Sequence, residues 1–383
     1  MSCRECGATS ELGSTHACSE CFGPLEVAYD LPLITRRTVE AGPLSMWRYA
    51  SLLPVPADVA STPNLDPGWT RLIKADQLAH ALGMRELWIK DERGNPTHSF
   101  KDRVVGVALA AAIELGFKVL ACPSTGNLAN AVGAAAARAG IRSVVLIPAD
   151  LEPQKITGTA IYGGTLVAVK GSYDDVNKLA SELADEREDW AFVNVNVRPY
   201  YAEGSKTIGF EVAEQLGWRL PEQIVVPVAS GAQLVKIDKA FRELTSLGLV
   251  ESAQYRVYGA QATGCSPVAA AFRAGHDVVQ PVRPATIARS LAIGNPADGP
   301  YVLDVTRRTG GCVADVSDDE IVDAIRLLAA SEGVWAETAG GVTLAVLRKL
   351  LAEEKIDRDA PTVIINSGDG LKTPDAVVDT SAA

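Results

Sequence analysis

The feature that most limits the fold of this chain is an alternation of short β-branched runs with helical stretches, which begins near residue 85. Strands that alternate with helices favour βαβ units, in which parallel strands form a sheet that helices cover on both faces. The predicted strands are residues 85–90, 117–122, 142–147, 165–169, 191–195, 223–228, 256–261 and 362–365. The predicted helices are residues 101–115, 128–139, 174–188, 203–216, 318–332 and 342–355, with others between 147 and 165 and after 233.

The length of 383 residues exceeds what one hydrophobic core usually supports, so we expect two lobes and a small appendage. The expected fold class is therefore α/β, with parallel or mixed sheets flanked by helices. The expected domains are residues 1–24 as a cysteine-rich module, 25–104 with 209–383 as the large domain, and 105–208 as a small mobile domain. Ligands of such sheets bind at the carboxyl ends of the strands. The loops after Cys122, Val228 and Ile365 should therefore form one functional rim.

The charge balance excludes some classes of partner. Lys and Arg number 36 and Asp and Glu number 47, which gives a net charge of −11. An acidic surface argues against general binding to nucleic acid or to anionic membranes. No apolar run approaches the roughly 18–20 residues that a membrane helix needs. The first residues lack the basic leader and apolar core of a signal peptide, so we expect a cytoplasmic protein.

Four of the seven cysteines lie within the first 21 residues. Cys3 and Cys6 form one Cys-x-x-Cys pair, and Cys18 and Cys21 form a second. This spacing is typical of a four-cysteine zinc ribbon, in which each pair places two thiolates on one tetrahedral ion. A redox pair and a ribbon without metal are the alternatives. Four thiolates would close the coordination sphere, so the expected zinc is structural rather than catalytic.

Three loops on the predicted rim have the composition of a ligand site. Residues 124–127 join a strand to an Ala-rich helix, and a glycine there lets the backbone approach a ligand. The small residues of the loop that follows 223–228 suit a phosphate cradle of backbone amides. A Gly-rich turn follows the last strand. Each loop alone is also compatible with an ordinary turn, so their significance rests on their combination.

Lys101 opens a predicted helix in the string Asn95-Pro-Thr-His-Ser-Phe-Lys-Asp-Arg103, with Ser99 as the expected N-cap and Asp102 three residues further on. A lysine in the first turn of a helix is ordinarily a solvated charge. This string, however, closely resembles the Asn-Pro-Thr-Gly-Ser-Phe-Lys-Asp-Arg signature of threonine synthases, which are pyridoxal-phosphate (PLP) enzymes of fold type II. His98 stands where the family usually has glycine, so the local backbone is expected to differ slightly. The resemblance extends along nearly the whole chain.

The resemblance implies a cofactor site. It implies that Lys101 holds PLP as a Schiff base, that Asn127 hydrogen-bonds the phenolic oxygen of the cofactor, and that Ser367 lies beside its pyridine nitrogen. The cofactor phosphate would lie on Ala229, Ser230, Gly231, Ala232 and Gln233, although this loop is poorer in glycine than the family's. The residues implied at the substrate are Ser99, Ser124 and Thr125, the last two at its carboxylate.

The substrate implied by the resemblance is O-phosphohomoserine, which these enzymes convert with water to threonine and phosphate. Lys101 would remove the α-proton as a general base. A phosphate subsite needs cations and polar groups, and Asn196, Arg198 and Lys206 are the candidates. Glu203-Gly-Ser-Lys-Thr207 matches the family's Glu-Gly-x-Lys-Thr segment, whereas the preceding Asn-x-x-Asn-Pro-x-Arg pattern does not align residue for residue. A homodimer is expected.

Two other functions are compatible with parts of this pattern. A second fold type II enzyme, such as a serine/threonine dehydratase or a cysteate synthase, would share the cofactor loops but would not need a distal phosphate subsite. A zinc-ribbon binding protein with a degenerate catalytic body is the alternative from another class. The intact Lys101 argues against it.

Overall fold

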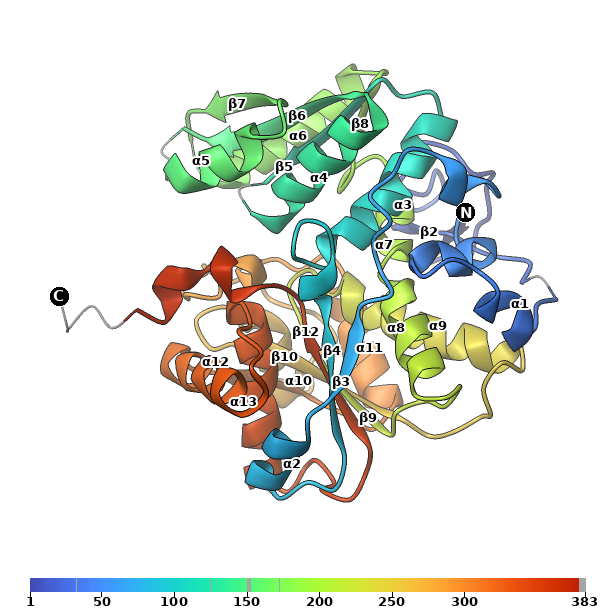
Figure 1. Cartoon of the computed structure of the whole chain (residues 1–383). Helices are drawn as coiled ribbons and strands as arrows, with labels where there is room; N and C mark the ends of the chain where they lie inside the picture. The colour runs from blue at the N-terminus through green and yellow to red at the C-terminus, as the bar shows by residue number, and fades with distance from the viewer. Residues whose placement is uncertain (32, 125, 150–152, 172, 379–383) are drawn as a thin grey trace. The chain divides into compact units, whose positions relative to one another are not determined.

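The computed structural model describes residues 1–31, 33–124, 126–149, 153–171 and 173–378, and its contacts divide the chain into two compact units (Figure 1). The first unit comprises Met1–Trp69 and Lys101–Thr207, and the second comprises Thr70–Phe100 and Ile208–Ala383. This division groups residues 25–69 with the first unit, whereas the expected boundaries assign them to the large domain. Those boundaries stay a prediction.

The second unit is built around a six-stranded sheet in the order β11-β10-β9-β12-β4-β3. The strands run parallel except β3, which pairs antiparallel with β4 and makes the sheet mixed. The strands are β3 (Arg71–Lys74), β4 (Leu87–Asp91), β9 (Gln223–Pro227), β10 (Arg256–Ala262), β11 (Val313–Val316) and β12 (Thr362–Asn366). Its helices are α2 (Asp76–Leu82), α9 (Ala232–Ser246), α10 (Pro267–Ala274), α11 (Gly299–Arg308), α12 (Asp318–Glu332) and α13 (Thr338–Ala352), together with most of α8 (Lys206–Gln215).

Both faces of this sheet are buried, as its near-continuous apolar strands require. Ile224 and Val226 belong to a core with residues of α8, α9, α10 and α11. Val225 points to the opposite face and packs with residues of α2, α12 and α13. The period of two along β9 therefore assigns successive side chains to two separate cores. This packing fixes the register of β9 and hence the start of the loop that follows it.

The first unit contains a parallel four-stranded sheet in the order β7-β6-β5-β8 and a small antiparallel pair, β1-β2, near the cysteines. Val119, Val144 and Phe192 of the larger sheet share an apolar core with Val176. The strands are β1 (Ser2–Cys3), β2 (Leu25–Glu26), β5 (Val119–Pro123), β6 (Arg142–Pro148), β7 (Thr165–Val169) and β8 (Trp190–Phe192). The helices are α1 (Arg36–Glu40), α3 (Lys101–Glu114), α4 (Asn127–Ala139), α5 (Pro153–Ala160), α6 (Tyr173–Glu186) and α7 (Arg198–Glu203).

The predicted α/β class with parallel and mixed sheets is confirmed, but one predicted helix is wrong at its start. Residues 203–216 were expected to form a single helix, whereas α7 ends at Glu203 and α8 begins at Lys206. The reason lies at Gly204, where a Cβ atom would come within 2.6 Å of both the carbonyl oxygen of Arg103 and the Cα of Val104. The chain is pressed against α3 there. The sequence pattern also gives no sign of the helices α1, α2, α7, α10 and α11 or of the strands β1, β2, β3 and β11.

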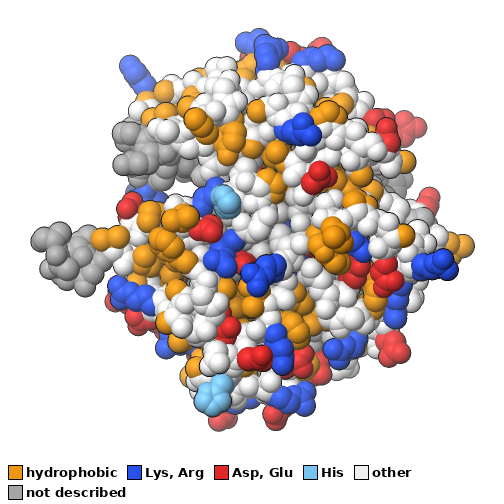
Figure 2. All heavy atoms as spheres, viewed as in Figure 1, with side chains coloured by type: hydrophobic (Ala, Val, Ile, Leu, Met, Phe, Trp, Pro, Cys, Tyr) orange, Lys and Arg blue, Asp and Glu red, His pale blue; other side chains and the backbone are white. Residues whose placement is uncertain are grey.

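The surface mixes both charges. Figure 2 shows Lys and Arg side chains interspersed with Asp and Glu on the face in view. Within the described residues, no helix combines the length and the apolar character that crossing a membrane would demand.

Candidate active site

Lys101 is the first residue of α3 and is half-buried. Its Nζ donates a hydrogen bond to the hydroxyl oxygen of Tyr201 over 2.8 Å, and it lies 5.4 Å from the centroid of that ring. Tyr201 belongs to α7, and the sequence analysis did not identify it. The sequence offers one indication of a tyrosine near this site, the pair Tyr200-Tyr201, which lies shortly before the matched segment Glu203-Gly-Ser-Lys-Thr207.

Lys206, a predicted substrate-phosphate ligand, is fully buried within the first unit. Its Nζ lies 2.9 Å from Oε2 of Glu203, donates to the carbonyl oxygen of Leu52 over 2.8 Å, and sits 3.9 Å above the ring of Tyr29. The hydroxyl of Tyr29 donates to the same Glu203 oxygen over 2.7 Å. These contacts support a structural role for Lys206 and give its predicted substrate role no support.

Asn196 and Arg198, the other two predicted phosphate ligands, lie between β8 and α7. The Oδ1 of Asn196 accepts from the backbone N–H of Phe192 over 2.8 Å, and its Nδ2 donates to the carbonyl oxygen of Trp190 over 3.0 Å. The amide therefore holds the turn that follows β8. Arg198 begins α7 and is partly exposed. The substrate roles of both residues stay predictions.

The loop between β5 and α4 carries Ser124 and Asn127. Ser124 is buried, and its Oγ accepts from the backbone N–H of Gly126 over 3.4 Å. Asn127 is the first residue of α4, one position earlier than expected, and Gly126 precedes it as the N-cap. Thr125 lies outside the described residues. Since the first amides of a helix have no intrahelical acceptor, the start of α4 can bind an anion.

The predicted phosphate loop, residues 229–233, follows β9 in the second unit and leads into α9. Gly231 has φ +99°, and a Cβ there would lie 2.7 Å from Cγ2 of Val302. Glycine is therefore required on both conformational and steric grounds. Ala232 is the first residue of α9, and the Oγ of Ser230 lies 3.5 Å from its N–H. The Nε2 of Gln233 is buried and has no hydrogen-bond partner among the described residues.

Ser367 follows β12 and is 2% exposed. Its hydroxyl donates to Oε1 of Glu337 over 2.8 Å, and Glu337 is the buried N-cap residue of α13. A Cβ at Gly368 would lie 2.7 Å from the same carboxylate oxygen, which explains the glycine. Because the single proton of Ser367 goes to Glu337, its oxygen keeps lone pairs that can accept a further hydrogen bond.

One prediction about the segment before Lys101, the cap at Ser99, is corrected, and a second, the slightly different backbone at His98, stays a prediction. Ser99 was expected to cap α3, but the helix begins at Lys101, and the buried Oγ of Ser99 has no hydrogen-bond partner among the described residues. The serine is one position too early to be the cap. His98 was expected to alter the local backbone. It has φ +62°, the left-handed conformation that glycine favours, with its N–H bonded to the carbonyl oxygen of Asn95 over 2.8 Å.

The second unit's residues fit the cofactor that the sequence predicts. The amides at the start of α9, the left-handed Gly231 and the unpaired Nε2 of Gln233 suit a phosphate. Ser367 offers a hydroxyl group to a pyridine nitrogen. Since β9 and β12 are parallel neighbours, the two loops leave the same edge of the sheet. The N–H of Phe100, the residue before Lys101, is bonded to the carbonyl oxygen of Ser367 over 3.0 Å.

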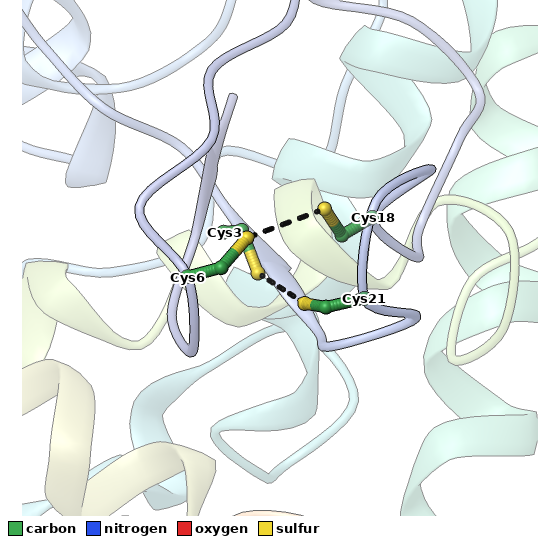
Figure 3. A group of neighbouring side chains, drawn as sticks. All are labelled: Cys3, Cys6, Cys18 and Cys21. Carbon is green, nitrogen blue, oxygen red and sulfur yellow. Dashed lines mark hydrogen bonds between the residues drawn. The ribbon is translucent and has the colours of Figure 1, made fainter.

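The four N-terminal cysteines form a separate cluster in the first unit, and Figure 3 shows their thiols turned toward one another. Their sulfur atoms all lie within 4.8 Å of one another, with Cys3–Cys21 at 3.5 Å and Cys6–Cys18 at 3.7 Å. A tetrahedral ion with metal–sulfur bonds of about 2.3 Å separates its thiolates by about 3.8 Å, so this donor set fits such an ion. The backbone N–H of Cys6 is the main cause that lowers the pKa of Cys3 to about 6, whereas the pKa of Cys21 rises to about 12 because the hydrogen bond from Gly23, which lowers it, is outweighed by its contacts with Cys6 and Cys3.

Comparisons with known proteins identify the family to which the chain belongs. Residues 64–368 match the family described as pyridoxal-phosphate dependent enzyme. The threonine synthase of Methanocaldococcus jannaschii is 37% identical over 98% of this chain and 93% of that protein. The threonine synthase of Methanosarcina acetivorans is 37% identical over 99% of this chain and 93% of that protein.

Solved structures show the same fold at low sequence identity. Diaminopropionate ammonia lyase from Escherichia coli superposes with a TM-score of 0.69 and 17% identity, over 90% of this chain and 92% of that one. Threonine deaminase isoform 2 from Solanum lycopersicum superposes with a TM-score of 0.67 and 20% identity, over 93% of this chain and 96% of that one. The fold is therefore that of fold type II. With the extensive similarity to the curated relatives, the chain belongs to the threonine synthase family of pyridoxal-phosphate-dependent enzymes.

Proposed function

We propose that this protein is a threonine synthase, which converts O-phospho-L-homoserine and water to L-threonine and phosphate. The observation that carries the proposal is the 37% identity over 98% of the chain to the Methanocaldococcus jannaschii threonine synthase. The Ser-Phe-Lys-Asp-Arg motif at the start of α3 supports it, because this motif presents a half-buried lysine beside a phenol hydroxyl.

Lys101 holds the cofactor and acts as the general base. When bound, pyridoxal phosphate supplies an electron-withdrawing group that makes the protons on the substrate's α- and β-carbons removable. The amine of Lys101 takes the α-proton. A β-proton and the γ-phosphate then leave the substrate. A proton is added at the γ-carbon, which becomes the methyl group of the product. Water adds at the β-carbon, and return of a proton to the α-carbon gives threonine.

The other predicted residues bind and orient. The amides of residues 229–233 bind the cofactor phosphate, with Gln233 as an added donor. The hydroxyl of Ser367, which donates to Glu337 in this structure, lies beside the pyridine nitrogen and leaves that nitrogen without a carboxylate to keep it protonated. Asn127 binds the phenolic oxygen, Ser124 and Thr125 bind the substrate carboxylate, and Ser99 contributes its buried hydroxyl. Asn196 and Arg198 contact the substrate phosphate.

We assign structural Zn²⁺ to Cys3, Cys6, Cys18 and Cys21. The spacing of their sulfur atoms and the N–H groups of Glu20 and Gly23, 3.4 Å from the thiols of Cys18 and Cys21, support this assignment. Four thiolates leave no open coordination position, so the ion stabilises the module and takes no part in the reaction.

The protein is further proposed to be a cytoplasmic homodimer whose smaller domain moves relative to the larger one. The seven cysteines form no disulfide with one another, which agrees with a reducing compartment. Light scattering coupled to size exclusion tests the dimer, and a single-chain mass at micromolar concentration contradicts it.

The test of the function is phosphate release from O-phosphohomoserine by the purified, cofactor-loaded protein, with threonine identified as the product by mass spectrometry. The alternative, a serine/threonine dehydratase, predicts a 2-oxo acid and ammonia from serine or threonine and no preference for the phosphorylated substrate. Dehydratase products without phosphate release from O-phosphohomoserine would overturn the proposal.

A further inference from the structure

Tyr201 lies against the reactive nitrogen of Lys101, and no role for it follows from the sequence motifs. Its hydroxyl oxygen is 2.8 Å from Nζ, and the side chain is 9% exposed. Both residues belong to the first unit, Lys101 at the start of α3 and Tyr201 in α7. The contact is therefore a property of one compact unit.

The surroundings of α7 hold Tyr201 in place. Gly204 lets the end of α7 approach the backbone of α3 closely, since any side chain there would collide with Arg103 and Val104. Arg103 donates to Oγ1 of Thr207 over 3.0 Å, and that hydroxyl donates to the carbonyl oxygen of Gly204 over 2.7 Å. The buried pair of Glu203 and Lys206 fixes the last turn of the helix. A hydroxyl fixed this rigidly can serve a reaction that needs constant geometry.

The chemistry of a phenol suits a lysine that changes protonation state. A hydroxyl is both donor and acceptor, so it can accept from the ammonium and donate to the lone pair of the neutral amine. A carboxylate in the same place accepts only, and would favour the ammonium. Because a general base alternates between the two states, a partner that can bond to both suits its nitrogen.

We propose that Tyr201 is a positioning residue that keeps Nζ of Lys101 in the reactive geometry in both protonation states. The proposal rests on the proposed function. When Lys101 takes the α-proton, its new N–H bond donates to the Tyr201 oxygen. When Lys101 returns a proton to carbon, the Tyr201 O–H donates to the amine. The phenol itself keeps its proton throughout, so no net charge accumulates on it.

The experiment compares Tyr201→Phe with Tyr200→Phe in the cofactor-loaded protein. Tyr200 is the matched control because it is the adjacent residue, it is buried, and its hydroxyl donates to the carbonyl oxygen of Gly13 over 3.0 Å, away from Lys101. Two quantities are measured: kcat and KM for O-phosphohomoserine, and the rate at which the α-proton of threonine exchanges with deuterium from the solvent.

We expect Tyr201→Phe to lower kcat by about 10²-fold, at the lower end of what acid–base catalysis contributes, with KM changed less than threefold. The exchange rate should fall in parallel, whereas Tyr200→Phe should leave both rates within threefold of the parent protein. A merely structural role would lower the unfolding midpoint without this split between kcat and KM. Unchanged kcat and exchange in Tyr201→Phe would overturn the proposal.

A second measurement on the cofactor-free protein separates this proposal from the proposed function. The rate at which an amine-specific acylating reagent modifies Lys101 is followed by peptide mass spectrometry, with exposed Lys178 as the internal reference. Loss of the hydrogen bond should speed modification of Lys101 at least threefold in Tyr201→Phe and leave it unchanged in Tyr200→Phe. Equal rates in all three proteins would show that the contact does not hold Nζ, whatever reaction the enzyme catalyses.

Discussion

Helix α7 contacts two lysines that have opposite surroundings. Tyr201 offers a phenol to Lys101, which is half-buried, and Glu203 offers a carboxylate to Lys206, which is fully buried. A carboxylate at 2.9 Å in a region without solvent holds its lysine as a charged partner, because removing either charge leaves the other unpaired. A phenol imposes no such constraint. The comparison predicts that the chemistry of the partner, together with burial, separates the proposed catalytic lysine from a structural one.

The second unit contains another buried lysine that is paired with a carboxylate. Nζ of Lys90 lies 2.6 Å from Oε2 of Glu211, and both side chains are fully buried. The same ammonium donates to the carbonyl oxygen of Thr70 over 2.8 Å and to Oε1 of Gln215 over 2.9 Å. All three protons of the ammonium thus have acceptors. Lys90 ties β4 to α8, in the way that Lys206 ties α8 to α7.

The comparison is tested most strongly by Lys101→Ala. We expect turnover of O-phosphohomoserine to fall by at least about 10³-fold, because the general base is lost along with the attachment of the cofactor. The free energy of unfolding should change by less than about 1 kcal/mol, since a half-buried side chain at a helix start is removed. Phosphate release and chemical denaturation measure the two effects. Normal threonine production by this variant would contradict the assigned chemistry.

Lys206→Met should give the reverse pattern, a large loss of stability with a small change in turnover. It leaves the carboxylate of Glu203 buried without its cation, so we expect the free energy of unfolding to fall by about 3–5 kcal/mol. Per folded molecule, turnover should remain within about tenfold of the parent value. Denaturant titration followed by activity at matched folded fractions checks both statements. A large rise in KM with unchanged stability would instead establish Lys206 as a phosphate ligand.

The matched control for that variant is the double change Lys206→Met with Glu203→Gln. Removing both charges avoids the unpaired carboxylate, so much of the lost stability should return. The hydroxyl of Tyr29 keeps an acceptor in the amide oxygen of the glutamine. If the double variant is as unstable as the sum of the single changes, the two residues are not coupled and the interpretation of the buried pair is wrong.

The cysteine cluster supports α7 from another side, through Tyr200 and Gly13. Removing bound metal with a chelator should expose the backbone amides of residues 1–24 to hydrogen exchange. The free energy of unfolding of the remaining protein should fall by only about 1 kcal/mol, the net contribution of one hydrogen bond. Metal analysis by mass spectrometry should give one zinc per chain. Protection of residues 1–24 that is insensitive to chelation would contradict a metal site.

The sequence was sufficient for what repeats along the chain or lies within one motif. The strand–helix alternation predicted the parallel sheets, and the string around Lys101 predicted the family. Contacts between distant residues were not predictable, because they depend on how helices pack. Tyr201 is one hundred residues from Lys101, and Glu337 is thirty from Ser367. The motif of Lys206 predicts a ligand of the substrate phosphate, because it contains no sign that Tyr29 and Leu52 enclose the side chain.

Ser99 and His98 show the same limit over a shorter range. The type of residue predicts Ser99 as the cap of α3, yet the helix begins two positions after it. At His98 the replacement of glycine predicts a slightly different backbone, and that stays a prediction. The hydrogen bonds of its N–H to Asn95 and of its carbonyl to Asp369 hold the residue in the left-handed conformation.

The smallest expected effect concerns this residue and compares His98→Gly with His98→Ala. Both remove the imidazole, whose Nδ1 lies 3.3 Å from the carbonyl oxygen of Arg93, so their difference isolates the backbone. A left-handed residue with a Cβ costs about 1 kcal/mol, which the greater freedom of glycine in the unfolded chain partly offsets. We therefore expect the glycine variant to be more stable than the alanine variant by about 0.5 kcal/mol, measured by denaturant titration. An alanine variant of equal or higher stability would show that φ +62° carries no strain, and that the segment before Lys101 tolerates a side chain as readily as the family's glycine.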